Sequence, residues 1–129
     1  MARLVRSPRF WLAGFLVWFG VLWLLSGSNP TGDYAPPIPN FDKIAHFGYF
    51  FGGSGLLCAY LYRRAPDRPN WRVIFTVAVI VIGLIGGLDE WHQSFTPGRT
   101  GNDPADLLAD VLGAAVGAFT FKRFHHQLK

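Results

Sequence analysis

The chain has 129 residues, of which 50% are hydrophobic and 16% charged, and its formal net charge is +4 at neutral pH. This length fits one domain, residues 1–129, and the apolar composition argues against an ordinary soluble protein. The single cysteine, Cys58, excludes an intrachain disulfide, and no nucleotide-binding, haem-binding or nucleophile-elbow motif is present.

Four apolar stretches predict four membrane-spanning helices. They cover approximately residues 10–27, 42–62, 72–93 and 104–121. Each approaches the ~20 residues that an α-helix needs to cross a ~30 Å hydrocarbon core. The first and third are strongly apolar, whereas Gly, Tyr and acids interrupt the second and fourth. The expected fold class is therefore an all-α integral membrane protein, a four-helix antiparallel transmembrane bundle.

The first stretch has a second interpretation, as a cleaved signal peptide. It follows an Arg-rich start, and Ser26-Gly27-Ser28 resembles a small-residue cleavage site. Its uninterrupted apolar region of about 16 residues exceeds the usual core of about 7–15 residues. We therefore expect this stretch to be retained as a span.

Basic residues are concentrated in three segments. All twelve Lys and Arg residues except Lys43 and Arg99 lie at the N-terminus, between the second and third spans, or at the C-terminus. All eight acids except Asp67 lie on the other side or in the helix ends that face it. The positive-inside rule then places both termini in the cytoplasm, with the protein in the bacterial cytoplasmic (inner) membrane. The excess of basic residues reflects the orientation of the spans in the membrane and contact with anionic lipid, rather than binding of nucleic acid.

The outer connections are expected to be irregular. The proline-rich segment 27–41 shows no helical periodicity. The second outer connection, residues 94–102, contains Thr96-Pro97-Gly98, which is a turn signal.

Glycines predict close helix packing. Gly48 and Gly52 are four residues apart in the second span, as are Gly113 and Gly117 in the fourth. Small residues at this spacing let helices approach closely in lipid. We expect the second, third and fourth spans to form one compact unit.

Helical spacing gathers polar side chains on one face of each of the last three spans. These stripes are Asp42–His46–Tyr49, Asp89–Gln93 and Asp106–Asp110. At 1.5 Å per residue from the nearest basic residue, Asp89 lies about 25 Å and Asp110 about 18 Å above the inner boundary. The pattern predicts a polar crevice that opens outward, with Asp110 towards its floor.

Helix capping accounts for some of the acids. Asp103 precedes Pro104, which is typical of an N-cap followed by the first helical residue. Asp42 lies near the start of its span and is equally suited to cap the helix or to face the crevice.

Capping does not account for Asp89, Glu90 and Asp110. The first two end a span at its outer face, where the helix dipole disfavours carboxylates, and Asp110 is too deep. Lys43 and Arg99 are the only Lys or Arg residues on this side, and the acids of the spans outnumber them. Either some carboxyls stay protonated, or a cation or cationic substrate group completes the site.

Three motifs together resemble the VanZ-like family of bacterial membrane proteins. They are Asp42-Lys43-x-x-His46-x-x-Tyr49, Asp89-Glu90-x-x-Gln93-x-Phe95-x-Pro97-x-Arg99 and Asp106-x-x-x-Asp110-x-x-Gly113-x-x-x-Gly117. That family is named for a protein that gives low-level resistance to the glycopeptide teicoplanin. The resemblance implies a role in cell-envelope biology. Family members often carry Asn where this chain has Asp110, which casts doubt on any mechanism that needs a neutral amide there.

The first functional hypothesis is binding without chemistry. Lys43 and Arg99 would hold an anionic head group, such as the phosphate of a lipid-linked envelope component. The remaining polar side chains of the crevice would complete the binding site: Asp42, Tyr49, Gln93, Asp106 and Asp110.

The second hypothesis is a membrane-embedded enzyme that acts on a lipid-linked envelope substrate. Asp89 or Glu90 would be the general base, His46 its acid/base partner, and Arg99 the stabiliser of developing negative charge. In a variant, Asp42 would join His46, Asp89 and Glu90 around a divalent cation, although the sequence has no strict metal-ligand spacing.

A third hypothesis, a proton or ion pathway, is less favoured because apolar residues 114–118 follow Asp110 towards the inner face. The sequence assigns no substrate, cofactor or oligomeric state.

Overall fold

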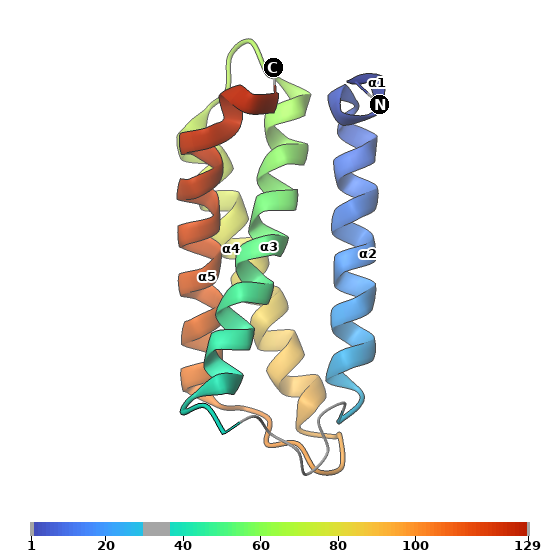
Figure 1. The fold of residues 1–129 in the computed structure, drawn as a ribbon, viewed down its shortest axis with the longest axis vertical. Helices are drawn as coiled ribbons and strands as arrows, with labels where there is room; N and C mark the ends of the chain where they lie inside the picture. The colour runs from blue at the N-terminus through green and yellow to red at the C-terminus, as the bar shows by residue number, and fades with distance from the viewer. Residues whose placement is uncertain (1, 30–36, 129) are drawn as a thin grey trace.

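The computed structural model describes residues 2–29 and 37–128 as a helical bundle (Figure 1). Its helices are α1 (Ala2–Arg6), α2 (Pro8–Ser26), α3 (Phe41–Arg64), α4 (Trp71–Gln93), α5 (Pro104–Phe124) and the 3-10 helix η1 (His125–Leu128). No strand occurs in the described ranges.

Four helices are long and apolar enough to cross a membrane, and they are the four predicted spans. α2 to α5 run alternately up and down, and the two ends of the chain lie at the same end of the bundle (Figure 1). The predicted all-α, four-helix antiparallel bundle is therefore confirmed. The prediction for the connection 27–41 falls mainly on residues 30–36, which lie outside the described residues.

Local sequence signals set the helix ends. The Asn70 side chain accepts a hydrogen bond from the Val73 N–H at 3.2 Å and starts α4. At α5 the Asp103 carboxylate accepts from the Ala105 N–H at 2.8 Å, and Pro104 occupies the first helical position. The N-cap predicted at Asp103 is confirmed. Asp42 does not cap α3, whose N-cap residue is Asn40.

The most extensive helix interface joins α3 to α5. A Cβ atom added at Gly117 would lie 2.6 Å from the Phe51 carbonyl oxygen, and one at Gly113 would clash with the Phe47 carbonyl. The Ser54 hydroxyl also donates to the Ala114 carbonyl at 2.7 Å. The close packing predicted from Gly113 and Gly117 is confirmed, because only glycine lets the two backbones approach this closely.

The matching prediction for the second span is wrong. Nothing lies within 4 Å of a Cβ atom added at Gly48 or Gly52. They follow Phe47 and Phe51, which face α5, and a step of one residue turns about 100° around a helix. Glycines on one partner are sufficient for the close approach.

α2 is held against α3 by a reciprocal pair of hydrogen bonds. The Trp18 indole N–H donates to the Tyr49 carbonyl at 3.1 Å, and the Tyr49 hydroxyl donates to the Trp18 carbonyl at 2.8 Å. The opposite side of α2 exposes apolar side chains such as Val17 and Leu24. In a membrane this side faces lipid.

Candidate functional site

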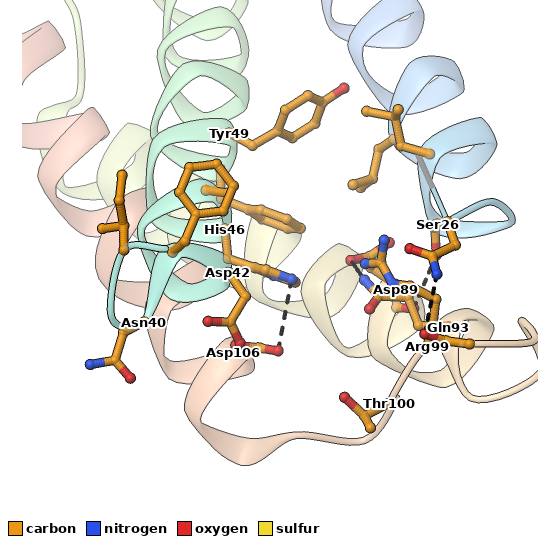
Figure 2. A pocket seen from close by; sticks show the side chains of 18 residues that line it. Ser26, Asn40, Asp42, His46, Tyr49, Asp89, Gln93, Arg99, Thr100 and Asp106 are labelled. Carbon is orange, nitrogen blue, oxygen red and sulfur yellow. Dashed lines mark hydrogen bonds and ion pairs between the residues drawn. The ribbon is translucent and has the colours of Figure 1, made fainter. Parts of the chain in front are cut away.

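A cavity of about 540 Å³ lies at the end of the bundle opposite the chain termini (Figures 1 and 2). It is bounded by the end of α2, the start of α3, the end of α4 and the loop before α5. Apolar side chains, among them Leu22, Leu25 and Phe50, line it together with polar ones. The polar lining residues are Ser26, Asn29, Asn40, Asp42, His46, Tyr49, Asp89, Gln93, Arg99, Thr100 and Asp106.

Lys43 is the centre of an acidic group beside this cavity. Its ammonium lies 2.8 Å from Asp42 Oδ2, 3.1 Å from Asp106 Oδ1 and 3.3 Å from Asp103 Oδ2. The Ala105 N–H, followed by the Lys43 ammonium, holds the pKa of Asp103 below its ordinary value. Lys43 therefore neutralises carboxylates of this protein, which leaves its charge less available to an anionic ligand.

His46 lies at the centre of a second group of acids. Its Nδ1 atom is 2.9 Å from Asp110 Oδ1, and Asp110 is completely buried. Its Nε2 atom lies 3.9 Å from Asp106 Oδ2 and 4.0 Å from Glu90 Oε1. Figure 2 shows the imidazole pointing towards Asp106 from α3. One ring nitrogen is thus hydrogen-bonded, while the other faces carboxylate oxygens.

The buried carboxylates each have one oxygen with a partner and one without. Asp89 Oδ2 accepts from the Gln93 amide at 2.7 Å, and Glu90 Oε2 accepts from the Asp103 backbone N–H at 2.7 Å. Asp89 Oδ1, Glu90 Oε1 and Asp110 Oδ2 are buried without a hydrogen-bond partner among the described residues. A buried, unpaired carboxylate oxygen is costly, so this pattern needs a chemical explanation.

Arg99 reaches the cavity through a tight turn. The Arg99 N–H donates to the Thr96 carbonyl at 3.1 Å, with Pro97 second and Gly98 third at φ 78°. These are the features of a type II turn, so the predicted turn is confirmed. The guanidinium forms no ion pair within 4.0 Å in the part of the chain that the structure describes.

The structure separates Lys43, His46 and the predicted site acids into two groups. His46, Asp89, Glu90 and Asp110 come together, with Asp106 joining them to the Lys43 group. Asp42 belongs to the Lys43 group, and the ligand set expected for a cation at Asp42, His46, Asp89 and Glu90 is not assembled as a whole. Tyr49 lines the cavity, but its hydroxyl points to α2.

Ser26 is a site residue that the sequence did not single out. It is buried, and its hydroxyl donates to the Asp89 carbonyl at 3.3 Å and lies 3.1 Å from His92 Nδ1. Its own carbonyl accepts from the Thr96 hydroxyl at 2.8 Å. The only available signal was a small polar residue at the end of an apolar span, in a segment that resembles a cleavage site but was expected to be retained.

The family model described as VanZ/LLP1 matches residues 6–125, which include all three polar motifs. The chain belongs to the VanZ/LLP1 family. This VanZ-like protein is accordingly a multi-pass membrane protein, as its four apolar helices also indicate. Comparison with curated proteins and with solved structures gives no match.

Proposed function

We propose that this VanZ-like protein binds the head group of an amphiphilic, lipid-linked component of the cell envelope. The observation that carries the proposal is the cavity, which sets apolar side chains beside a polar cluster at the ends of membrane-spanning helices. Its volume of about 540 Å³ is within the usual range for a small-molecule site. An amphiphile places its polar group at this depth in a bilayer.

We further propose that the cavity opens on the outer face of the cytoplasmic membrane. The end of α3 and the α3–α4 connection, which carry basic residues such as Arg64 and Arg68, lie at the same end of the bundle as the chain termini (Figure 1). Lys and Arg favour the cytoplasmic side of a membrane. The cavity is at the other end, where an envelope component is displayed.

Arg99 is the proposed anion contact. A guanidinium can donate two parallel hydrogen bonds to a phosphate, whereas the Lys43 ammonium is already shared by three carboxylates. The turn Thr96–Arg99 holds Arg99 at the cavity. A lipid-linked phosphate or pyrophosphate fits this contact, with its hydrocarbon chain along the lipid-facing helices.

The test is binding of a polyprenyl pyrophosphate to the protein in nanodiscs. Loss of hydrogen bonds to a charged group costs about 1.5–3 kcal/mol, so Arg99→Ala should weaken binding by about 10- to 100-fold. Arg68→Ala, which changes an exposed arginine at the opposite end, is the matched control. Equal affinities for the wild type and Arg99→Ala would refute the proposal.

A second candidate function is acid–base chemistry on the same class of substrate. The 2.9 Å contact between His46 Nδ1 and Asp110 favours it, because a carboxylate that orients an imidazole prepares the other ring nitrogen for proton transfer. His46→Ala should then abolish any change in lipid-linked intermediates that expression of the protein causes. The same strains, tested for teicoplanin susceptibility, connect either function to the resistance that the family's name implies.

A further inference from the structure

We propose that His46, Asp89 and Glu90 form a binding site for a divalent transition-metal ion. One ligand atom of each residue lies within 4.8 Å of the other two. Two atoms bound to the same metal at ~2.1 Å lie at most about 4.2 Å apart. A small closure of the three side chains therefore brings all of them into bonding distance.

The unpaired oxygens are the independent observation that indicates a cation. Asp89 and Glu90 are each only 3% exposed, yet Asp89 Oδ1 and Glu90 Oε1 have no hydrogen-bond partner among the described residues. Buried charges in proteins are normally paired or coordinate a metal. Glu90 Oε1 faces His46 Nε2 at 4.0 Å, and a shared cation would neutralise the carboxylates that surround the imidazole.

Each proposed ligand is also oriented by a second hydrogen-bonding group. His46 Nδ1 lies 2.9 Å from Asp110 Oδ1, and the tautomer that donates to this carboxylate leaves the Nε2 lone pair towards the cluster. The Gln93 amide orients Asp89, and the Asp103 backbone N–H orients Glu90. A metal-binding histidine almost always donates its second ring nitrogen to a carboxylate, carbonyl or water, and ligating carboxylates are themselves hydrogen-bonded.

The donor set selects the kind of metal. One imidazole nitrogen with two carboxylate oxygens suits Zn²⁺ or Mn²⁺ better than Mg²⁺ or Ca²⁺, which prefer oxygen ligands alone. The neighbouring acids Asp42 and Asp103 are excluded, because the Lys43 ammonium already neutralises them. The ion is therefore assigned to the histidine group.

The metal site deepens the proposed function. The role that we assign to the ion rests on that function, whereas the existence of the site does not. Asp89 and His46 line the cavity, so a coordination position not filled by the protein would face it. An ion at this position would attract a phosphate group despite the carboxylates around the cavity. Three protein ligands with an open position are typical of sites that bind or activate a ligand.

The experiment measures metal binding without lipid substrate. Purified protein in detergent is stripped with a chelator, then titrated with Zn²⁺ by calorimetry and with Mn²⁺ by electron paramagnetic resonance. We expect about one ion per chain. His46→Gln and Glu90→Gln should each lower the affinity at least about 100-fold, and Asp110→Asn about 10- to 100-fold, as for a residue that positions a ligand.

The controls are Asp67→Asn, an exposed acid at the opposite end of the bundle, and His92→Gln, a histidine near Ser26, and both should bind the metal normally. In the metal-free protein, Glu90→Gln removes a buried negative charge and so relieves its repulsion with the neighbouring carboxylates. Elution of the variant as a single species in size-exclusion chromatography checks that it is folded. The site is refuted if the wild type binds neither metal, if His46→Gln and Glu90→Gln bind like the wild type, or if Asp67→Asn abolishes binding. Normal metal binding by Arg99→Ala with lost lipid binding would separate this inference from the proposed function.

Discussion

Asp110 is fully buried because a glycine of α4 lies opposite it. A Cβ atom added at Gly86 would lie 2.7 Å from Asp110 Oδ2 and 3.0 Å from its Cβ. The same carboxylate bonds His46 through its other oxygen. A methyl group at position 86 would therefore displace the residue that orients the imidazole.

We predict that Gly86→Ala destabilises the protein by about 1–3 kcal/mol, the usual cost of overpacking. Gly87→Ala is the matched control, because nothing lies within 4 Å of a Cβ atom there. A helical glycine with open space around its Cβ position should gain up to about 1 kcal/mol when alanine replaces it. Cys58 is buried, so the reaction of its thiol with a fluorogenic maleimide during heating reports unfolding. Equal melting temperatures for the two variants would contradict the packing described for Asp110.

At the scale of elements, the residue that caps α5 also contacts the candidate site. The Asp103 side chain caps α5, and its backbone N–H donates to Glu90 at the end of α4. The lysine that faces Asp103 comes from α3, so the ends of three helices meet at this residue beside the cavity. The sequence predicted the cap, but it could not predict the contact with Glu90.

The charge of Asp103 should make stability depend on pH. The Ala105 N–H and the Lys43 ammonium hold its pKa below the ordinary value of 3.8. A carboxyl with a lowered folded-state pKa stabilises the fold above its unfolded pKa and loses this effect as the pH falls through the folded value. Asp103→Asn keeps a capping oxygen but removes the charge.

We predict that Asp103→Asn melts below the wild type at pH 7 and that the difference shrinks as the pH falls below 3.8. Asp67→Asn, an exposed acid in the turn between α3 and α4, is the control and should leave the melting temperature unchanged. A difference that stays constant down to pH 3 would rule out a role for the charge.

At the scale of the whole molecule, the two ends of the bundle differ in charge. The termini and the α3–α4 connection carry most of the basic residues, whereas the opposite end holds the cavity and most of the acids. This asymmetry motivates the orientation proposed for the protein. Thr100, exposed beside the cavity, and Asp67, exposed at the basic end, are suitable reporters of the two sides.

We predict that Thr100→Cys reacts with a membrane-impermeant maleimide in intact cells, whereas Asp67→Cys reacts only after the membrane is permeabilised. The native Cys58 should contribute little background, because it is completely buried. The reverse pattern would place the cavity on the cytoplasmic side and overturn the proposed access to an envelope component.

The sequence by itself determined the four spans, the cap at Asp103 and the turn before Arg99. These features depend on residues close together in the chain, through hydropathy, a single hydrogen bond or a φ angle that favours glycine. Helical periodicity also placed Asp89 with Gln93 on one face, and the structure joins them at 2.7 Å.

Only the tertiary structure decided which polar groups meet. Periodicity shows which residues share a face of a helix, but not how that helix is rotated against its neighbour. It therefore could not predict that the glycines of α5, and not those of α3, make the close contact. Nor could it predict that Asp42 and His46 belong to different groups. It also could not associate Ser26 of α2 with the end of α4. Helix rotation, fixed by close contacts such as Gly117 on Phe51, sets His46 between Asp110 and the unpaired oxygen of Glu90.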